Sequence, residues 1–532
     1  MTSMNRREML KISSACSLAA LASATPSSAA SMPENNHASV PRWEVFELAI
    51  AGPSTGNPFV DVQLAATFTL EHRTVTVSGF YDGEGMYKIR FMPDTEGDWT
   101  YATSSNASEL RGKTGRFTCA PALNGAHGPV AVRNQHHFAY ADGTPFFPFG
   151  TTCYAWVHQN EELQRQTLET LRNAPFNKLR MCVFPKSYEY NHNEPPLYPF
   201  ERDAGGNSDF TRLNPAYFAH LEQLIGDLRV LGIEADLILF HPYDRWGYAK
   251  MPAEADDRYL KYVLARMSAY RNIWWSMANE FDLMRAKSVQ DFDRFFHIVE
   301  QYDPVSHLRS IHFSRVTYDY SHPWVTHACL QSSKFESAPE MLETLRKPIL
   351  FDEVQYEGNL NRRWGNISGE EMTRRFWLGV IGGCYVTHGE TLLDPDGPLD
   401  ESTTTVLWWA HGGKLKGMSP ARIRFLRTLV EETASRVGKD AMRTGLEAQA
   451  APYYLNAVSV DASGTTTQEI LYYTDSHQPI FYEFPLPAGK FTAELIDPWE
   501  MKAEKLPGTY EGKAKLKLTG RPYQAVRFQR VV

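Results

Sequence analysis

The centre of the chain, residues 128–438, alternates apolar runs of strand length with amphipathic segments of helix length. The strand-like runs are PFFPFGTTCYAW, KLRMCVFP, IEADLILFHP, IWWSMANEF, RSIHFS, WVTHACLQS, PILFDEV and GCYVTHGE. Helices are expected at 161–172, 217–231, 256–270, 288–302, 339–346 and 368–381. Apolar strands separated by helices are typical of a parallel sheet that helices cover. Eight such strands over about 300 residues predict a (β/α)8 TIM barrel.

One connection departs from the regular alternation. The fifth and sixth runs are separated by only about ten residues, so the fifth helix is expected to be absent or to be a single turn. A doubly wound open sheet is the alternative architecture. However, no glycine-rich phosphate-binding loop follows the first run, and this favours the barrel.

Two shorter regions, residues 41–127 and 451–532, flank the centre and have a different rhythm. In both of them, short runs of alternating apolar and polar residues are separated by turn-forming residues such as Gly, Asn and Asp. That spacing is typical of antiparallel β-sandwiches. We therefore predict an N-terminal and a C-terminal antiparallel β-sandwich on either side of the barrel.

The first thirty residues have the pattern of an export signal. Adjacent Arg6 and Arg7 precede a modestly apolar run, residues 12–24, and the small residues that end at Ala30 offer a cleavage site. The run is too short to span a bilayer permanently, and the string RREMLK resembles a twin-arginine signal. Cys16 lacks the apolar residue that a lipoprotein signal has three positions earlier. Export to the periplasm or the medium is therefore expected, without a membrane anchor.

Composition and short motifs indicate which partners and cofactors the protein is expected to bind. The formal net charge is −8 over 532 residues, so no concentrated basic face for nucleic acid is expected. Five cysteines follow the signal without a C-x-x-C pair, which favours buried thiols over disulfides. No H-E-x-x-H motif or Cys/His cluster with metal spacing occurs, so neither a metal nor another cofactor is expected. The sequence does not indicate an oligomeric state.

Acidic residues stand at the ends of two different strand-like runs. The fourth run ends in Asn279-Glu280 and the seventh in Asp352-Glu353. The active site of a (β/α)8 barrel lies at the carboxyl ends of its strands. Glycoside hydrolysis needs one acid to protonate the leaving oxygen and one carboxylate to attack or to activate water, and different surroundings separate their pKa values. The sequence offers Glu280 and Glu353 as this pair, with Asp352 and Glu357 as rivals for the place of Glu353; a helix cap or surface acid is the structural alternative for Glu280.

On these motifs the central region resembles the retaining glycoside hydrolases of clan A. The resemblance implies that Glu280 is the acid/base and that Glu353 is the nucleophile of a double displacement. It also implies that Asn279 binds the sugar 2-hydroxyl and that Arg180, late in the second strand, supports the nucleophile. The substrates that it implies are β-D-glycosides or stereochemically equivalent α-L-arabinofuranosides.

The chain after the signal also resembles a narrower, largely uncharacterised group of glycoside hydrolases that combine an N-terminal β-sandwich, a barrel and a C-terminal β-sandwich. The segments that carry this likeness are GTTCYAWVHQ, WWSMANEFD, DEVQYEGN, THGET and LWWAHGGKLKG. One feature departs from clan A, where many members place a tyrosine after the sixth strand. That strand reads THACLQ here, and His327, Gln331 or Tyr356 is expected to take the tyrosine's place.

Further polar and aromatic residues at the strand ends are candidates for substrate binding. They are Tyr154, Trp156, His158, Gln159, His241, Tyr356, His388, Glu390 and Trp408. Structural alternatives stand beside them, such as aromatic packing under a loop for Trp156 and a core histidine for His241. Trp408 and Trp409 are neighbours, so in an extended run only one of them faces the cleft.

These observations predict a retaining glycosidase that acts on plant- or algal-type poly- or oligosaccharides and needs no cofactor. One rival is a non-catalytic carbohydrate-binding protein built on a degenerate barrel. Another is a barrel hydrolase that cleaves an amide or an ester. The G-x-S-x-G match in the chain, GPSTG at residues 52–56, lies in the N-terminal flank and not between a strand and a helix of the centre, which disfavours the usual serine hydrolases.

Overall fold

The computed structural model describes residues 38–394, 405–441, 447–449, 456–461 and 466–531. Residues 39–532 form one compact unit. The expected export signal, residues 1–30, lies outside the described residues. In the part of the chain that the structure describes, no helix combines the length and the apolar character needed to cross a membrane.

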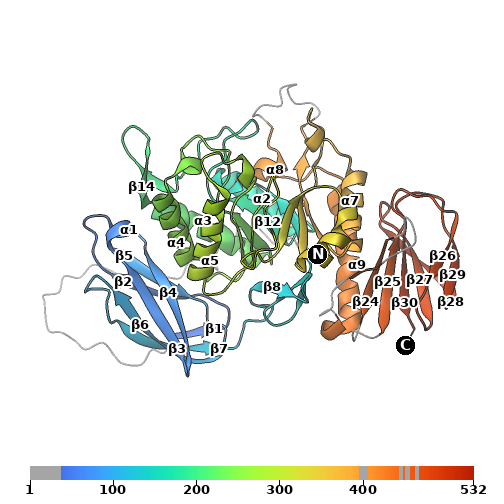
Figure 1. The fold of residues 1–532 in the computed structure, drawn as a ribbon, viewed down its shortest axis with the longest axis horizontal. Coiled ribbons are helices and arrows are strands. Elements are labelled where there is room, and N and C mark those ends of the chain that lie inside the picture. The colour runs from blue at the N-terminus through green and yellow to red at the C-terminus, as the bar shows by residue number, and fades with distance from the viewer. Residues whose placement is uncertain (1–37, 395–404, 442–446, 450–455, 462–465, 532) are drawn as a thin grey trace, which may run out of the picture. The chain divides into compact units, whose positions relative to one another are not determined.

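Eight parallel strands form the centre of this unit (Figure 1). They are β11 (Phe149–Thr152), β12 (Lys178–Cys182), β15 (Glu234–Ile238), β16 (Ile273–Ser276), β17 (Arg309–Ser310), β18 (Ala328–Gln331), β19 (Ile349–Glu353) and β21 (Tyr385–His388). Their order in the sheet is β17-β16-β15-β12-β11-β21-β19-β18. A parallel bridge between His312 and Cys329 joins the two end strands. The sheet is therefore a closed barrel, which confirms the prediction from the apolar runs.

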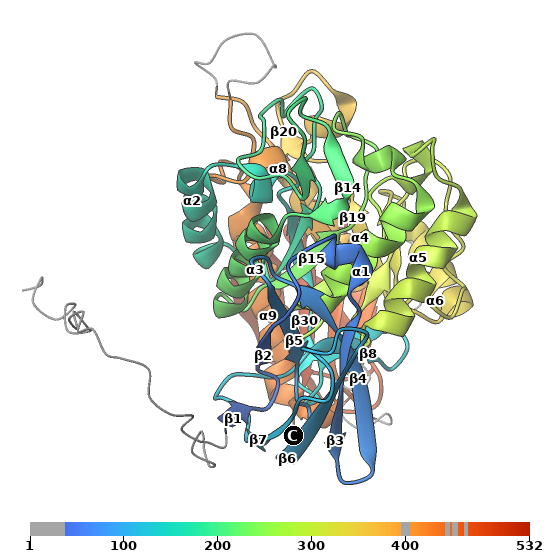
Figure 2. The ribbon, with the colours of Figure 1, turned by 90° about the vertical axis from the view of Figure 1, so that its left-hand side faces the viewer.

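Helices lie around the barrel strands (Figure 2). They are α2 (Glu161–Arg172), α3 (Pro215–Val230), α4 (Ala253–Met267), α5 (Val289–Tyr302), α6 (Ala338–Leu345), α7 (Gly369–Ile381) and α9 (Ser419–Ala441). Local sequence sets several starts: the Asn160 side chain accepts from the Leu163 N–H at 2.9 Å, and Ser288 forms a capping box with Asp291. No helix occurs in the fully described stretch between β17 and β18, as the short spacing predicted.

A small sheet covers the amino-terminal end of the barrel. It consists of β8 (Val130–Arg133), β9 (His137–Tyr140) and β10 (Pro145–Phe146). Phe138 packs against Trp274 and Tyr385, with ring centroids 5.1 and 5.3 Å apart. The aromatic side chains therefore close this end, and the opposite end is left for a site.

The N-terminal strands form a seven-stranded sheet with antiparallel pairs. They are β1 (Ala38–Pro41), β2 (Phe46–Ala51), β3 (Leu64–Leu70), β4 (Arg73–Tyr81), β5 (Met86–Phe91), β6 (Gly97–Ser105) and β7 (Thr114–Ala120). Buried ion pairs join this sheet to the barrel helices: Arg90 Nη1 lies 2.7 Å from Glu222, and Arg266 Nη1 lies 2.7 Å from Asp82. The strands and their antiparallel pairing are as expected; their description as a β-sandwich stays a prediction.

The C-terminal strands also pair antiparallel. A six-stranded sheet comprises β23 (Glu447–Gln449), β24 (Asn456–Asp461), β25 (Thr467–Tyr473), β27 (Phe491–Asp497), β28 (Lys502–Tyr510) and β30 (Ala525–Arg530), and β26 (Phe481–Pro485) pairs with β29 (Lys513–Lys517). Trp377 of α7 stacks on Tyr473 of β25 with ring centroids 5.3 Å apart, and Arg374 forms an ion pair with Asp475 at 2.5 Å. These contacts fix the sheet against α7. The strands pair antiparallel as expected, and their description as a second β-sandwich stays a prediction.

The barrel interior contains a buried ionic layer. Lys178 Nζ lies 2.7 Å from Asp236 Oδ2 and 2.8 Å from Asp352 Oδ1, and the lysine side chain is fully buried. Thr387 also donates to Asp352, at 2.5 Å. Burial raises the pKa of Asp352, but the charges of Lys178 and Arg180 outweigh burial and hold this pKa well below its usual range. Asp352, one rival for the nucleophile, therefore forms its ion pair and hydrogen bonds inside the barrel.

Candidate active site

A cavity of about 640 Å³ opens at the carboxyl ends of the barrel strands. Its wall is rich in aromatic rings, with acids and amides between them. The lining residues are Tyr154, Lys186, Tyr188, Glu189, Tyr190, Tyr243, Asn279, Glu280, Ser314, Gln331, Ser332, Ser333, Glu353, Val354, Gln355, Tyr356, Trp364 and Trp409. Aromatic faces beside polar groups suit the alternating apolar and hydroxyl faces of a sugar ring.

Glu280 and Glu353 both line this cavity, and each is paired with a different tyrosine. Glu353 is the last residue of β19, and the Tyr154 hydroxyl donates to its Oε1. Glu280 follows β16 by four residues, and the Tyr243 hydroxyl donates to its Oε2. Their exposed fractions are only 7% and 9%. Two nearly buried carboxyl groups therefore meet one cavity from two strands.

The backbone at Glu280 is in the left-handed region, with φ of +49°. A non-glycine residue held there costs about 1–3 kcal/mol. Hydrogen bonds on both sides hold this conformation: Asn279 N donates to Phe240 O at 2.9 Å, and Phe281 N donates to His312 O at 3.0 Å. The fold thus stabilises a strained turn that directs Glu280 into the cavity.

Glu353 has several groups around it that favour negative charge. Arg180 Nη1 lies 3.9 Å from its Oε1, and Lys186 lies on the same cavity wall. Burial, and next the charge of Glu280, raise the pKa of Glu353 to about 7, while Arg180, the Tyr154 hydroxyl and Lys186 lower it. The pKa of Glu353 therefore lies near neutral pH, above the ordinary range of a glutamate.

His312 lies beside both acids and was not singled out from the sequence. Its Nε2 is 3.8 Å from Glu353 Oε1, and its Nδ1 is 3.4 Å from the Glu280 backbone N–H. Burial, and next the charge of Arg180, hold the pKa of His312 well below its usual range, so the ring is neutral. It stands in the run RSIHFS, where it reads as one polar residue of a buried strand.

Asn279, Tyr356 and Trp409 are also on the cavity wall. Asn279 Oδ1 accepts from Arg180 Nη2 at 3.3 Å and lies 3.2 Å from the Tyr154 hydroxyl. Trp408 differs from its expected place, because residues 408–411 form the short helix α8 (Trp408–His411) rather than an extended run. Its indole donates to Thr151 Oγ1 at 2.8 Å, beneath the wall. Trp409 is thus the member of the pair that reaches the cavity.

Four other candidates lie beneath the cavity and do not line it. Trp156 donates to Gln164 O at 3.4 Å. His158 Nε2 is 3.2 Å from Cys182 O, and His241 Nε2 is 3.0 Å from Phe184 O. Gln159 donates to Ala155 O at 2.9 Å. Burial lowers the pKa of both histidines to about 3, so they are neutral supports for the strand ends.

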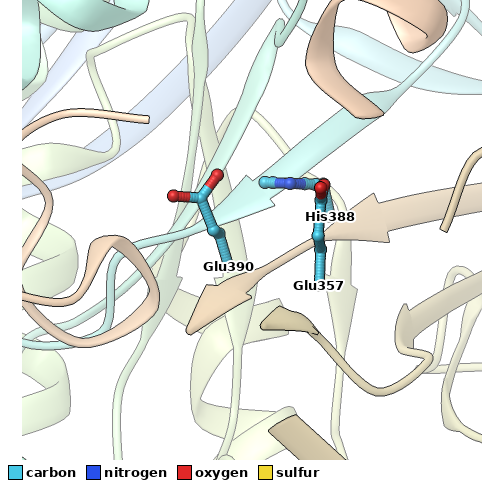
Figure 3. Close-up of side chains that lie close together, drawn as sticks. All are labelled: Glu357, His388 and Glu390. Carbon is cyan, nitrogen blue, oxygen red and sulfur yellow. The ribbon is translucent and has the colours of Figure 1, made fainter. Parts of the chain in front are cut away.

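Glu357, His388 and Glu390 gather in a separate buried group (Figure 3). One ligand atom from each lies within 4.8 Å of the others, which is the closest approach to a metal site among the described residues. The carboxylate oxygens already accept backbone N–H groups: Glu390 accepts from Lys416 and Gly417 at 2.7 Å each, and Glu357 accepts from Met418 at 2.6 Å and Ser419 at 3.1 Å.

These donors direct their positive ends at the same oxygens that would bind a cation, so the two acids anchor the segment 416–419 that leads into α9. His388 Nδ1 lies 3.2 Å from Thr151 Oγ1, and its ring stacks on Phe176. Glu357, the other rival for the nucleophile, and the substrate-binding candidates His388 and Glu390 are therefore placed outside the cavity wall.

The residues proposed to replace the clan tyrosine lie in different places. Gln331 is beside Glu280: with its amide oriented to donate, it lies 3.3 Å from Glu280 Oε1 and 2.9 Å from Phe313 O. His327 packs near Trp274 at the covered end of the barrel, with ring centroids 5.4 Å apart. Tyr356, the third of them, lies on the cavity wall beside Glu353, whose charge adds to burial in raising the Tyr356 pKa. Tyr154, just after the first barrel strand, also donates to Glu353.

Several wall residues were not singled out from the sequence. They are Lys186, Tyr188, Tyr190, Tyr243 and Trp364. The segment KSYEY begins four residues after the second barrel strand, and HPYD begins three residues after the third. Aromatic residues shortly after a barrel strand are the signal that could have found the three tyrosines.

Comparison with known proteins places the chain among the glycoside hydrolases. An apiosidase-like catalytic domain matches residues 132–393, and two domains of unknown function, DUF5060 and DUF5605, match residues 39–106 and 459–529. No curated protein matches the chain.

One solved structure, described as a "putative glycoside hydrolase" from Bacteroides vulgatus, is 39% identical with a TM-score of 0.83; the match covers 93% of this chain and 100% of that one. A family 5 glycoside hydrolase from the same organism is 14% identical with a TM-score of 0.55, over 76% of this chain and 94% of its own. The second likeness shows the fold alone.

Proposed function

This chain is a glycoside hydrolase with an apiosidase-like catalytic domain, and from that premise we propose that it cleaves O-glycosidic bonds by double displacement with retention of configuration. Glu353 is the nucleophile and Glu280 the acid/base. Retaining glycosidases of clan A use one glutamate after each of the corresponding strands, as the sequence resemblance implies.

In the first step, protonated Glu280 gives its proton to the glycosidic oxygen as the Glu353 carboxylate attacks the anomeric carbon. The bond to the leaving group breaks and a glycosyl ester forms on Glu353. In the second step, Glu280, now a carboxylate, takes a proton from water. The water oxygen attacks the same carbon, the ester bond breaks, and both glutamates return to their starting states.

The observation that carries the proposal is the unequal surroundings of the two acids. Arg180 is a positive side chain that favours negative charge on Glu353, and its Nη1 lies 3.9 Å from Glu353 Oε1. Glu280, by contrast, has the neutral partners Tyr243 and Gln331. The charge of Arg180 therefore stabilises the carboxylate that attack requires at Glu353, and Glu280 takes the role of proton donor in this proposal.

The substrate in this proposal is a plant- or algal-type poly- or oligosaccharide. The aromatic wall supports a sugar ligand, because rings such as Tyr188 and Trp409 offer apolar faces beside hydroxyl-binding groups. Export by the twin-arginine route, into the periplasm or beyond, is proposed on the sequence of the first thirty residues.

Paired variants test the roles. With an aryl glycoside that the enzyme hydrolyses, Glu353→Gln is expected to lower kcat by about a thousandfold or more with the melting temperature retained. Glu280→Ala is expected to recover activity with sodium azide, which needs no general base, and to yield a glycosyl azide of retained configuration. Glu357→Gln is the matched control, since its carboxylate is outside the cavity. Near-normal turnover by Glu353→Gln, or loss of turnover only in Glu357→Gln, would refute the assignment.

A further inference from the structure

Lys186 stands on the cavity wall four residues after β12, with its ammonium group among aromatic rings. Its Nζ lies 3.8 Å from the ring centroid of Tyr154, 4.4 Å from that of Tyr188 and 4.3 Å from that of Tyr243. The Trp409 centroid is 5.6 Å away. Only 2% of the lysine is exposed. A positive charge is therefore held almost out of water at the edge of the cavity.

This chain pairs its other buried lysines with acids. Lys178 lies 2.7 and 2.8 Å from two aspartates, and Lys287, with a side chain 2% exposed, lies 2.6 Å from Asp256. Among the described residues, no carboxylate lies within ion-pair distance of Lys186. An unpaired buried charge is costly, and burial lowers the pKa of Lys186 accordingly. Such a charge beside a cavity suggests that a ligand supplies its partner.

Two neighbouring donors are also unused. The Tyr188 hydroxyl and the Trp409 indole N–H are buried and find no hydrogen-bond partner among the described residues, and both side chains line the cavity. Their rings contact each other, with centroids 5.4 Å apart. The side chains that carry these three donors, an ammonium, a hydroxyl and an indole N–H, thus lie together on one part of the wall. Convergent donors around one charge are the arrangement that binds an oxyanion.

Lys186 is the one cationic side chain on the described cavity wall. Of the three acids there, Glu280 and Glu353 are the proposed catalytic pair, and Glu189 is neutralised by Arg362 at 2.6 Å. An anionic ligand would otherwise be repelled by the catalytic carboxylates, so a cation close to them changes which ligands the cavity admits.

We infer that Lys186, with Tyr188 and Trp409, binds an anionic substituent on the substrate sugar, either the carboxylate of a uronic acid or a sulfate ester. The inference extends the proposed function, and it rests on that function because it takes this cavity as the site that binds the sugar. Lys186 then selects acidic glycosides over neutral ones of the same shape. A simpler role, as a counter-charge to Glu280 and Glu353, makes no distinction between acidic and neutral sugars.

The test is calorimetric binding of monosaccharides to the full-length enzyme. Glucuronate, galacturonate, mannuronate and guluronate, and the 6-sulfates of glucose and galactose, are each compared with the neutral sugar of the same stereochemistry. At least one acidic sugar is expected to bind about tenfold or more tightly than its neutral counterpart. Tighter binding of a uronate indicates that the bound anion is a carboxylate, and tighter binding of a sugar sulfate indicates that it is a sulfate ester.

Lys186→Met keeps the length of the side chain and removes its charge, and is expected to reduce the preference to about twofold or less. Tyr188→Phe keeps the ring and is expected to reduce the preference partly, which is a second test if the first variant does not fold. Lys334→Met, an exposed lysine outside the wall, is the matched control and is expected to retain the preference.

Equal or weaker binding of every acidic sugar would overturn the inference, as would an equal loss of acidic and neutral sugars in Lys186→Met. Hydrolysis of aryl glycosides is followed in parallel to separate the two proposals. Glu353-dependent hydrolysis of neutral glycosides without any acidic preference contradicts the inference but leaves the proposed function standing. An acidic preference with Glu353-independent hydrolysis contradicts the proposed mechanism and supports the inference.

Discussion

The hydrogen bond from Tyr154 to Glu353 gives a quantitative test of how the nucleophile is kept ionised. Tyr154→Phe removes the donor and keeps the ring in place. A hydrogen bond to a charged group contributes about 1.5–3 kcal/mol, and one pKa unit corresponds to about 1.4 kcal/mol. The hydroxyl lowers the pKa of Glu353, which is about 7. The variant should therefore raise this pKa by about 1–2 units.

The expected result is an acid limb of the kcat/KM profile that moves up by about 1–2 pH units. The ionised fraction of Glu353 at pH 7 then falls from about half to roughly 1–10%, so kcat/KM at pH 7 falls about 5- to 50-fold. A neutral aryl glycoside assayed from pH 4 to pH 10 measures this limb. Tyr510→Phe is the matched control, because its hydroxyl donates to Pro507 O at 3.0 Å in the C-terminal sheet and lies outside the cavity wall. An acid limb that stays in place in Tyr154→Phe, with the fold intact, would refute the reasoning.

Two further predictions concern stability. Lys178→Met removes the cation that lies closest to buried Asp236 and Asp352 and leaves only Arg180 beside them, so it should lower the free energy of unfolding in urea by about 3–5 kcal/mol. A change like that of exposed Lys334→Met would contradict it. Burial raises the pKa of Glu234 from 4.5 to about 8, so the folded state binds the extra proton and stability from this group falls as pH rises from about 4.5 to 8. Between pH 5 and pH 8, the free energy of unfolding of Glu234→Gln should therefore rise by roughly 2–4 kcal/mol relative to that of the wild type. Parallel curves of unfolding free energy against pH for the two proteins would contradict this.

The barrel and the two glutamates could be predicted because both leave a local signal. Strands buried on both faces read as apolar runs, and a residue directly after such a run must lie at the open end of the barrel. Glu280 and Glu353 satisfy this rule, and the structure brings both to one cavity. The absence of a helix between β17 and β18 also follows from spacing alone.

The rest of the wall depends on how loops fold back, which spacing does not encode. Lys186 and Tyr243 reach the cavity from segments beyond their strands. His388 and Glu390 stand at a strand end yet serve the barrel interior and the segment before α9. Trp408 and Trp409 exchange their expected roles because a single helical turn replaces an extended run. In each case tertiary packing decides which side chain meets the ligand.

Double displacement through Glu353 fixes the anomeric configuration of the first product, so this configuration is the decisive measurement. Proton NMR recorded during the first minutes of hydrolysis of an aryl glycoside, before mutarotation, reports that configuration. We expect the first-formed sugar to have the same anomeric configuration as the substrate. A first product of opposite configuration would show a single displacement by water and would contradict the role given to Glu353.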